Sequence, residues 1–294
     1  MYKTEKSLFC FGMGRVLTQL SLILSARGWG VSGTCKSEEK KDQLNSIDLS
    51  SYIFDSDKEI PDIYDKIKNC THILISIPPK DEGCVVIKYY HSLFKSLKNL
   101  SWIGYVSSTS VYGDYPDQWV DEEASLNTKS QMGINRIKAE NQWREIAKNT
   151  SIPLQIFRAG GIYSSSRNQV TKVISNSGEP FIKNDIKFNR IHQDDLVGVI
   201  LASFKLDDGI NVFNVVDDEP ASTWSQIKFI CKRLKLPIPE SKVLGEIEIS
   251  EKKRNFFNEN KLVKNDLIKK KLDYQLKFPT YKEGLGYIIE QLRS

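Results

Sequence analysis

The sequence has few of the residues that build disulfide frameworks, metal sites and membrane spans. Its five cysteines are scattered along 294 residues without a C-x-x-C pair, and its three histidines stand far apart. This spacing predicts a reduced, cytoplasmic protein without a structural metal. No apolar run approaches the roughly 20 residues of a membrane span. The first residues, MYKTEK, lead into an apolar segment without a cleavage-type signal.

A strong charge of one sign is also missing. The chain has 42 basic and 37 acidic residues, and its net charge of +5 is thinly spread. The Lys-Lys-Arg run at 252–254 and the Lys-Lys-Lys run at 269–271 are interpreted as solvated helix faces, not as a nucleic-acid footprint. With 40% hydrophobic and 27% charged residues, the composition predicts a globular core in one large domain or two modest ones.

Apolar runs of strand length alternate with helical patterns in the first part of the chain. Strands are predicted at 7–12, 29–35, 52–55, 72–79, 101–109 and 154–163. Helices are predicted at 15–27, 57–69, 84–98 and 131–147. Strands that alternate with helices form right-handed βαβ units, so we expect an α/β fold with a parallel sheet covered on both faces.

After about residue 163 this alternation loosens. Helices are predicted at 223–235 and 280–292, and the segment 211–218 has the pattern of one more strand of the sheet. We therefore divide the chain into a domain of residues 1–163 and a smaller lobe of residues 164–294, with segments near 191–218 returning to the first domain.

The segment FCFGMGRVL joins the first predicted strand to the first helix through a G-x-G turn. Gly12 permits a tight turn, and Gly14 lets the backbone approach a pyrophosphate that the helix N-terminus attracts. The third glycine of G-x-G-x-x-G is replaced by Leu17. The position of the turn predicts dinucleotide binding through Gly12, Met13, Gly14 and Arg15; the alternative is a plain tight turn.

The end of the second predicted strand bears on the choice of dinucleotide. NAD-preferring sites usually carry Asp or Glu there, on the ribose 2′-hydroxyl. Here the strand ends in Thr34, Cys35, Lys36 and Ser37. Lys36 and Ser37 favour a 2′-phosphate, and so NADP over NAD; the alternative is that Lys36 is a solvated loop lysine.

The segment YVSSTSVYGDY at 105–115 resembles the SS-x-x-VYGD signature of the extended short-chain dehydrogenase/reductases, the NAD-dependent epimerase/dehydratase family. Further matching segments are spread along the chain: LISIPP, FRAGGIY, RIHQDDL, FNVVDDEP and NENKLVKNDLI. The RIHQDD and PTYKEG segments are similar to those of the YeeZ-like branch.

The resemblance implies a Rossmann-type, doubly wound sheet with a smaller C-terminal substrate-binding lobe. It also implies that Ser76 and Pro78 of LISIPP belong to the cofactor site and that Ser108 bonds the reacting oxygen. Family members carry a Tyr-x-x-x-Lys pair on the next helix, and its tyrosine transfers the proton. Counting back from Glu140, as in YGxSKxxxE, places Met132 and Arg136 at these two positions.

The replaced pair limits the chemistry that we expect. A methionine thioether cannot transfer a proton, whereas Arg136 keeps a positive charge that could bind the ribose or a phosphate. Ser108, Tyr112 and Arg136 are therefore the candidate catalytic residues. For Tyr112 the alternative is a tyrosine that only packs the turn.

Three side chains of the smaller lobe are candidates for substrate binding. Arg167 lies in IYSSSRN, which resembles a family loop, and could face an anionic substrate. Arg190 and His192 are expected to orient the lobe or the substrate, and the acids after them, Asp194 and Asp195, to cap the following helix. One histidine and two acids at this spacing are too little for a metal site.

These observations predict a protein that binds a nicotinamide dinucleotide, NADP in preference to NAD. The leading function is an epimerase/dehydratase-like or reductase-like enzyme for a nucleotide-linked sugar or a related small molecule, with an atypical active site. One rival is a non-catalytic NADP-binding sensor or regulator, and another is a structural, chaperone-like protein that binds no dinucleotide. No nucleic-acid or membrane partner is expected. The sequence leaves the oligomeric state open, and family members are often homodimers.

Overall fold

The computed structural model describes residues 6–55, 58–175, 181–183, 186–243 and 259–293. The chain forms two compact units. Unit 1 comprises Met1–Val111, Gln131–Arg158 and Val199–Phe213, and unit 2 comprises Tyr112–Ser130, Ala159–Gly198 and Asn214–Ser294. The assignment of dinucleotide binding to residues 1–163 and of substrate binding to 164–294 stays a prediction.

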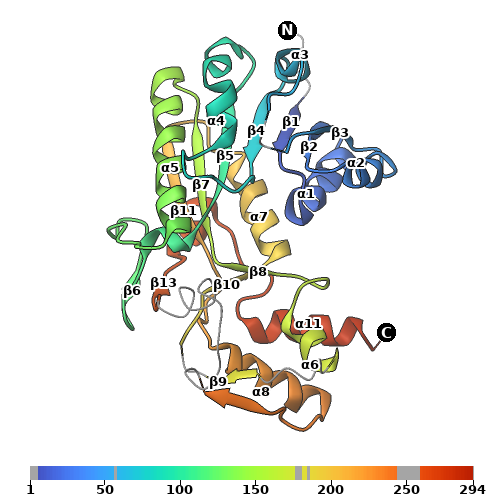
Figure 1. The fold of residues 1–294 in the computed structure, drawn as a ribbon, viewed down its shortest axis with the longest axis vertical. Helices are drawn as coiled ribbons and strands as arrows, with labels where there is room; N and C mark the ends of the chain where they lie inside the picture. The colour runs from blue at the N-terminus through green and yellow to red at the C-terminus, as the bar shows by residue number, and fades with distance from the viewer. Residues whose placement is uncertain (1–5, 56–57, 176–180, 184–185, 244–258, 294) are drawn as a thin grey trace. The chain divides into compact units, whose positions relative to one another are not determined.

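A seven-stranded sheet forms the centre of unit 1 (Figure 1). Its strands are β1 (Ser7–Phe11), β2 (Gly30–Cys35), β3 (Ser50–Ile53), β4 (His72–Ile75), β5 (Trp102–Ser108), β7 (Leu154–Ala159) and β11 (Ile210–Val215). Their order is β11-β7-β5-β4-β1-β2-β3, and β1 pairs in parallel with both β2 and β4. The order therefore reverses between β1 and β4, as in a Rossmann-type sheet. The predicted fold class is confirmed, and the predicted strand at 211–218 joins the sheet as β11.

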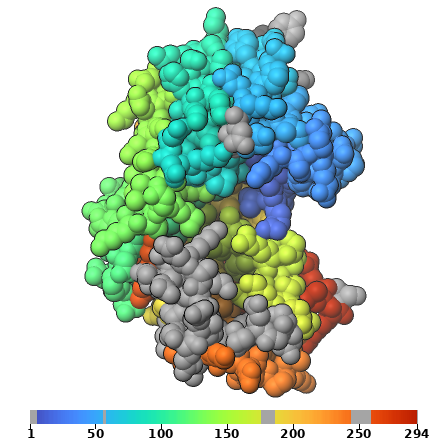
Figure 2. Space-filling model, viewed as in Figure 1, coloured from blue at the N-terminus to red at the C-terminus, as the bar shows by residue number. Residues whose placement is uncertain are grey.

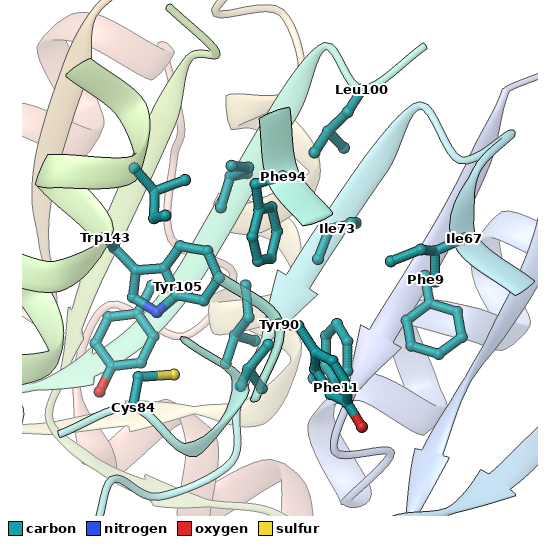
Figure 3. Close-up of a cluster of buried hydrophobic side chains, with 14 of the residues drawn as sticks. Phe9, Phe11, Ile67, Ile73, Cys84, Tyr90, Phe94, Leu100, Tyr105 and Trp143 are labelled. Atoms are coloured by element: carbon teal, nitrogen blue, oxygen red, sulfur yellow. The ribbon is translucent and has the colours of Figure 1, made fainter. Parts of the chain in front are cut away.

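Helices cover this sheet. They are α1 (Arg15–Ala26), α2 (Glu38–Asn45), α3 (Ile63–Ile67), α4 (Val85–Tyr90), the 3-10 helix η1 (His91–Ser96), α5 (Gln131–Thr150) and α7 (Gln193–Ser203). In the described part of the chain, none is both long and apolar enough to cross a membrane. Apolar strands and helix faces together form a core in which Phe9 and Ile73 are fully buried. Figure 3 shows Trp143 of α5 in this core, close to Tyr105 and Cys84.

Several predicted elements differ from the structure. The helix predicted at 84–98 is divided into α4 and the 3-10 helix η1, and the strand predicted at 72–79 ends at Ile75. The helix predicted at 57–69 is short and extends from Ile63 to Ile67. The strand predicted at 154–163 is divided into β7 and β8 (Gly161–Tyr163). The division follows from the hydrogen bonds: the Gly161 amide donates to Asn189 O at 2.9 Å, and β8 pairs with β10 (Arg190–His192) instead of a strand of the large sheet.

Unit 2 is built from short paired strands and three packed helices. Besides β8 and β10, its strands are β6 (Trp119–Val120), β13 (Leu262–Val263), β9 (Phe181–Lys183) and β12 (Ser241–Val243), and the last four form the parallel pairs β13-β6 and β12-β9. Helices α6 (Gln169–Ser175), α8 (Thr223–Leu234) and α11 (Tyr281–Gln291) share one hydrophobic core. The remaining elements are η2 (Thr109–Tyr112), at the junction of the units, and α10 (Asp266–Leu272).

The structure tests the solvated-face interpretation for one of the two basic runs. The run at 269–271 lies in α10, and its three lysines are exposed, which confirms the interpretation as a solvated helix face. The run at 252–254 lies outside the described residues.

Candidate functional site

The G-x-G turn follows β1 at the carboxyl edge of the sheet. Gly12 has φ +96°, a conformation that side chains rarely adopt. A Cβ at this position would lie 2.9 Å from Ile77 Cγ1 and 3.0 Å from Ser76 Oγ. The backbone conformation and the lack of space both require glycine, which confirms the predicted tight turn.

The amino end of α1 is open above this turn. Gly14 is the N-cap residue and gives no side-chain cap, and the first helical turn contains no acidic residue. A Cβ at Gly14 would meet no atom within 4 Å, and the Arg15 side chain is exposed. An uncapped helix N-terminus with free space above it attracts anions, so this end of unit 1 fits the phosphates of a dinucleotide.

The missing third glycine is compensated on the neighbouring strand. Leu17, which takes its place, is buried in the core at 1% exposure. Gly33 of β2 instead allows the close approach, because a Cβ there would clash with Cys10 O and lie 2.8 Å from Met13 Cγ. The Met13 side chain is thus buried under the turn, and its amide donates to Thr34 O, so the predicted ligand contact of Met13 is not favoured. No local motif in the sequence marks Gly33.

The end of β2 places the residues that were predicted to bind the adenosine ribose. Cys35 is buried, while Lys36 and Ser37 are exposed. Ser37 caps α2, and its Oγ accepts from the Lys40 amide at 3.3 Å, so its hydroxyl hydrogen can still reach a ligand. Glu38 begins α2 and forms an exposed ion pair with Lys41 at 3.1 Å.

The fourth strand contributes Ser76 and Pro78 at the same edge. Ser76 Oγ donates to Gly12 O at 2.7 Å, so this hydroxyl contacts the turn itself. Pro78 is exposed two residues further on. The structure therefore brings the turn, the end of β2 and the end of β4 together in unit 1, and the roles of these residues with a cofactor stay predictions.

Helix α5 carries the two residues that replace the tyrosine and the lysine. Met132 is 57% exposed. Arg136 points toward β5, where its Nη1 donates to Val106 O at 2.7 Å and to the Tyr105 hydroxyl at 3.2 Å. Tyr105 has no exposed surface, and burial raises the pKa of its phenol despite the nearby guanidinium, so this buried hydroxyl is poorly placed to contact a substrate. Arg136 is anchored to the sheet through one of its nitrogens.

A buried ion pair fixes α5 against the sheet below Arg136. Glu140 Oε2 accepts from Arg158 Nη2 at 2.8 Å, and both side chains are at most 3% exposed. Glu140 Oε1 accepts from Arg158 Nε at 3.1 Å and from Ser107 Oγ at 2.6 Å. Both carboxylate oxygens of Glu140 are engaged, so the pair defines the position of α5 on β5 and β7.

The two candidate catalytic hydroxyls differ in environment. Ser108 ends β5, is half-buried, and its Oγ accepts from the Ser110 amide at 3.2 Å. Tyr112 belongs to unit 2, has no exposed surface, and its hydroxyl donates to Asn214 Oδ1 at 2.6 Å. A side chain with no exposed surface and an engaged hydroxyl is poorly suited to contact a substrate. These contacts favour the packing alternative for Tyr112, and its catalytic role stays a prediction.

Unit 2 holds the three residues predicted to bind substrate. Arg167 is exposed in the loop between β8 and α6. Arg190 is half-buried and donates to Phe188 O at 3.0 Å, to Ala221 O and to Thr223 Oγ1 at 3.3 Å. Burial lowers the pKa of Arg190 to about 10, although the nearby Asp217 carboxylate opposes this shift. These contacts tie segments of unit 2 together, as expected if Arg190 orients the lobe.

His192 is buried at 2% exposure, and its Nδ1 accepts from the Asp194 amide at 3.2 Å. Burial lowers its pKa, so the neutral ring, whose Nδ1 lone pair accepts this bond, is favoured. The prediction that Asp195 caps the helix is wrong. Its carboxylate accepts from the amides of Lys277 and Phe278 at 2.6 and 3.0 Å and from the Tyr274 hydroxyl at 3.0 Å. Among the described residues no cluster of metal ligands occurs.

The geometry of unit 1 defines a class of protein, a Rossmann-type α/β protein with an uncapped helix N-terminus at the first strand–helix turn. No protein-family model matches the chain. It is 31% identical to a conserved protein of unknown function from Silicibacter pomeroyi, whose structure matches with a TM-score of 0.89 over 97% of this chain and 99% of the other. The chain belongs to the same family as that protein.

Three further comparisons agree with this result. Protein YeeZ from Escherichia coli (strain K12) is 23% identical over 219 residues, which are 71% of this chain and 77% of YeeZ. An NAD-dependent epimerase/dehydratase from Methylobacillus flagellatus is 21% identical, with a TM-score of 0.72 over 99% of this chain and 100% of the other. UDP-glucuronic acid 4-epimerase from Bacillus cereus, solved with UDP-glucuronic acid and NAD, is 16% identical, with a TM-score of 0.73 over 98% and 99% of the two chains. The resemblance to the extended short-chain dehydrogenase/reductases and their YeeZ-like branch is confirmed.

Proposed function

We propose that unit 1 binds a nicotinamide dinucleotide, with its phosphates at the amino end of α1. The observation that carries this proposal is the tight turn at Gly12, with φ +96°, which is followed by Gly14, whose lack of a side chain leaves the uncapped helix end open. Proteins of the same fold from M. flagellatus and B. cereus are described as NAD-dependent and as bound to NAD. When bound, the dinucleotide would accept or donate a hydride.

Within this function, NADP is the preferred cofactor. Lys36 is exposed at the end of β2, and the hydroxyl hydrogen of Ser37 can donate to a 2′-phosphate. Glu38 would repel that phosphate, but its ion pair with Lys41 reduces the repulsion. The balance of charge at this edge therefore favours the phosphorylated ribose.

A charge reversal at Lys36 tests this preference. Lys36→Glu is expected to weaken NADP⁺ binding by about tenfold, because one ion pair with the 2′-phosphate is replaced by repulsion. NAD⁺ binding is expected to change little. Lys95→Glu, an exposed reversal on η1, is the matched control for net charge. Wild-type protein that binds NAD⁺ more tightly than NADP⁺ in a thermal-shift titration would contradict the preference.

The proposed substrate is a nucleotide-linked sugar or a related small molecule, the kind of ligand with which the B. cereus epimerase was solved. Ser108 Oγ accepts from the Ser110 amide, so its own hydrogen is available for a substrate oxygen. Arg136 keeps its positive charge beside the end of β5 and is assigned to the ribose or a phosphate. Arg167 is assigned to an anionic group of the substrate.

A second candidate function is a non-catalytic dinucleotide sensor. This function is favoured by the residue at the position of the family's tyrosine. That residue is Met132, which is 57% exposed and cannot transfer a proton. Incubation with a panel of nucleotide sugars, while the absorbance of reduced nicotinamide is followed, separates the two functions. Turnover supports the enzyme, whereas an inert protein whose partner affinity depends on the NADP/NADPH ratio supports the sensor. A chaperone-like protein would bind no dinucleotide at all.

The double variant Met132→Tyr/Arg136→Lys restores the usual pair. If the missing tyrosine limits the chemistry, this variant is expected to gain activity on at least one nucleotide sugar, with cofactor affinity retained. Arg136→Lys alone is the control, because it changes the cation without adding a proton donor. A double variant that folds, binds cofactor and stays inactive would count against this explanation of the atypical site.

A further inference from the structure

Two hydroxyl groups from neighbouring strands hold the Gly12 turn from opposite sides. We infer that Thr34 of β2 and Ser76, directly after β4, are positioning residues that set the direction of the phosphate-binding amides at the start of α1. This inference rests on the proposed dinucleotide binding. It assigns a role to Thr34, which sequence analysis treated only as part of a strand end, and a different role to Ser76.

Thr34 satisfies two amides of the turn. Its Oγ1 accepts from the Gly12 amide at 2.9 Å, and its carbonyl oxygen accepts from the Met13 amide at 2.6 Å. The side chain has no exposed surface. The buried hydroxyl of Thr34 in β2 therefore stabilises the backbone of the turn that follows β1.

Ser76 holds the same residue from the other side. Its Oγ donates to Gly12 O at 2.7 Å, and its amide donates to Phe11 O at 2.9 Å. Gly12 O also accepts from the Gly14 amide at 2.8 Å. The Gly12 amide is thus bonded by the Thr34 side chain, and the Gly12 carbonyl by the Ser76 side chain.

These bonds have a consequence for ligand binding. The amides of Gly12, Met13 and Gly14 all have acceptors inside unit 1, so a phosphate has to be bound by the amides that follow. Those amides belong to Arg15 and Val16 in the uncapped first turn of α1. Their direction depends on the turn before them, and a ligand gains affinity when such donors are already oriented. Loss of the Thr34 or the Ser76 hydroxyl would allow Gly12 more conformational freedom. The amides at the start of α1 would then be less well oriented toward a phosphate.

The experiment is a calorimetric titration of NADP⁺ and NAD⁺ into wild type, Thr34→Val, Thr34→Ser and Ser76→Ala, with thermal unfolding of each variant measured alongside. Thr34→Val keeps the shape and removes the hydroxyl, and Thr34→Ser keeps the hydroxyl. The matched control is Thr71→Val. Thr71 is also buried and its Oγ1 accepts from the Ser7 amide at 2.9 Å, but it lies at the amino edge of the sheet.

Thr34→Val and Ser76→Ala are each expected to weaken the better-bound dinucleotide by about tenfold, the effect of one well-placed hydrogen bond. Thr34→Ser is expected to keep most of the wild-type affinity. Thr71→Val is expected to lower thermal stability as Thr34→Val does, with wild-type affinity. Equal affinities for Thr34→Val and Thr71→Val, while wild type binds a dinucleotide, would overturn the positioning role alone. A wild type that binds neither dinucleotide would overturn the proposed function, and with it the role of both hydroxyls.

Discussion

Burial decides the protonation state of His72, at the amino end of β4. The side chain is 6% exposed, packs against Trp29 and Phe204 at ring distances of 4.8 Å, and its Nδ1 lies 2.9 Å from Thr71 Oγ1. Burial, with a smaller contribution from the charge of Lys6, lowers the pKa of His72 from 6.5 to about 4. The folded protein therefore keeps this ring neutral in mildly acidic solution.

This shift predicts a loss of stability in acid. Between pH 6.5 and about 4 the unfolded chain binds a proton at His72 that the folded chain does not, so the free energy of unfolding falls as pH is lowered. The loss from His72 between neutral pH and about pH 5 is expected to be about 2 kcal/mol. In denaturant unfolding at both pH values, His72→Phe should reduce the pH dependence by that amount. His91→Gln, an exposed control, should leave it unchanged; equal pH dependence in His72→Phe and wild type would refute the prediction.

The Glu140–Arg158 pair gives a second prediction for a single residue. Glu140→Gln leaves a buried guanidinium without its counter-charge, which costs about 3 kcal/mol of the free energy of unfolding. Glu145→Gln, on the exposed face of the same helix, is the control and should change stability by less than about 0.5 kcal/mol. Denaturant titration measures both. A loss for Glu140→Gln as small as that of the control would show that the pair does not hold α5.

At the scale of elements, the polar face of α5 holds the loop between β4 and α4. Residues 131, 135, 138 and 142 recur on one side of the helix, as helical periodicity requires. Asn135 Nδ2 donates to Asp81 Oδ1 at 3.0 Å, and Gln142 Oε1 accepts from the Cys84 amide at 2.8 Å. Figure 2 shows the corresponding blue-green and yellow-green segments in contact on the surface of unit 1. The loop after the fourth strand is thus fixed to the helix that carries Arg136.

Gln142→Ala tests this contact. Loss of the side chain removes the acceptor of the Cys84 amide, so its hydrogen exchange should become faster by about tenfold or more, as local opening becomes easier. Amides in the centre of β1 should exchange as in wild type. Asn141→Ala, on the exposed side of α5, is the matched control. Unchanged exchange at Cys84 would show that the loop is held by other contacts.

The elements that could be predicted from the sequence are those with a strong local pattern. The strands predicted at 7–12 and 72–79 are rich in apolar residues, and Gly28 marks the end of the first helix. The Pro78-Pro79 pair places the end of the fourth strand only approximately, because β4 ends at Ile75. The division of 154–163 into β7 and β8 was not predictable in this way. It depends on a hydrogen bond to Asn189, far along the chain, and local periodicity contains no such information.

The same distinction applies to the candidate site. Gly12 and Gly14 were predictable because a G-x-G turn has a local signature. Thr34 and Gly33 act across strands on the turn after β1, and nothing in their own neighbourhood marks them. The buried partner of Tyr112 could not be predicted in this way, because Asn214 is distant in sequence.

At the scale of the whole molecule, the protein combines a Rossmann-type unit that fits a dinucleotide with a second unit to which we assign substrate binding. The central proposal is that the protein holds a nicotinamide dinucleotide. Native mass spectrometry of the purified protein, before and after addition of NADP⁺ and NAD⁺, tests that claim most directly. The expected result is a complex with one dinucleotide per chain, formed more readily with NADP⁺. A protein that carries no dinucleotide as purified and takes up neither one on addition would contradict the account.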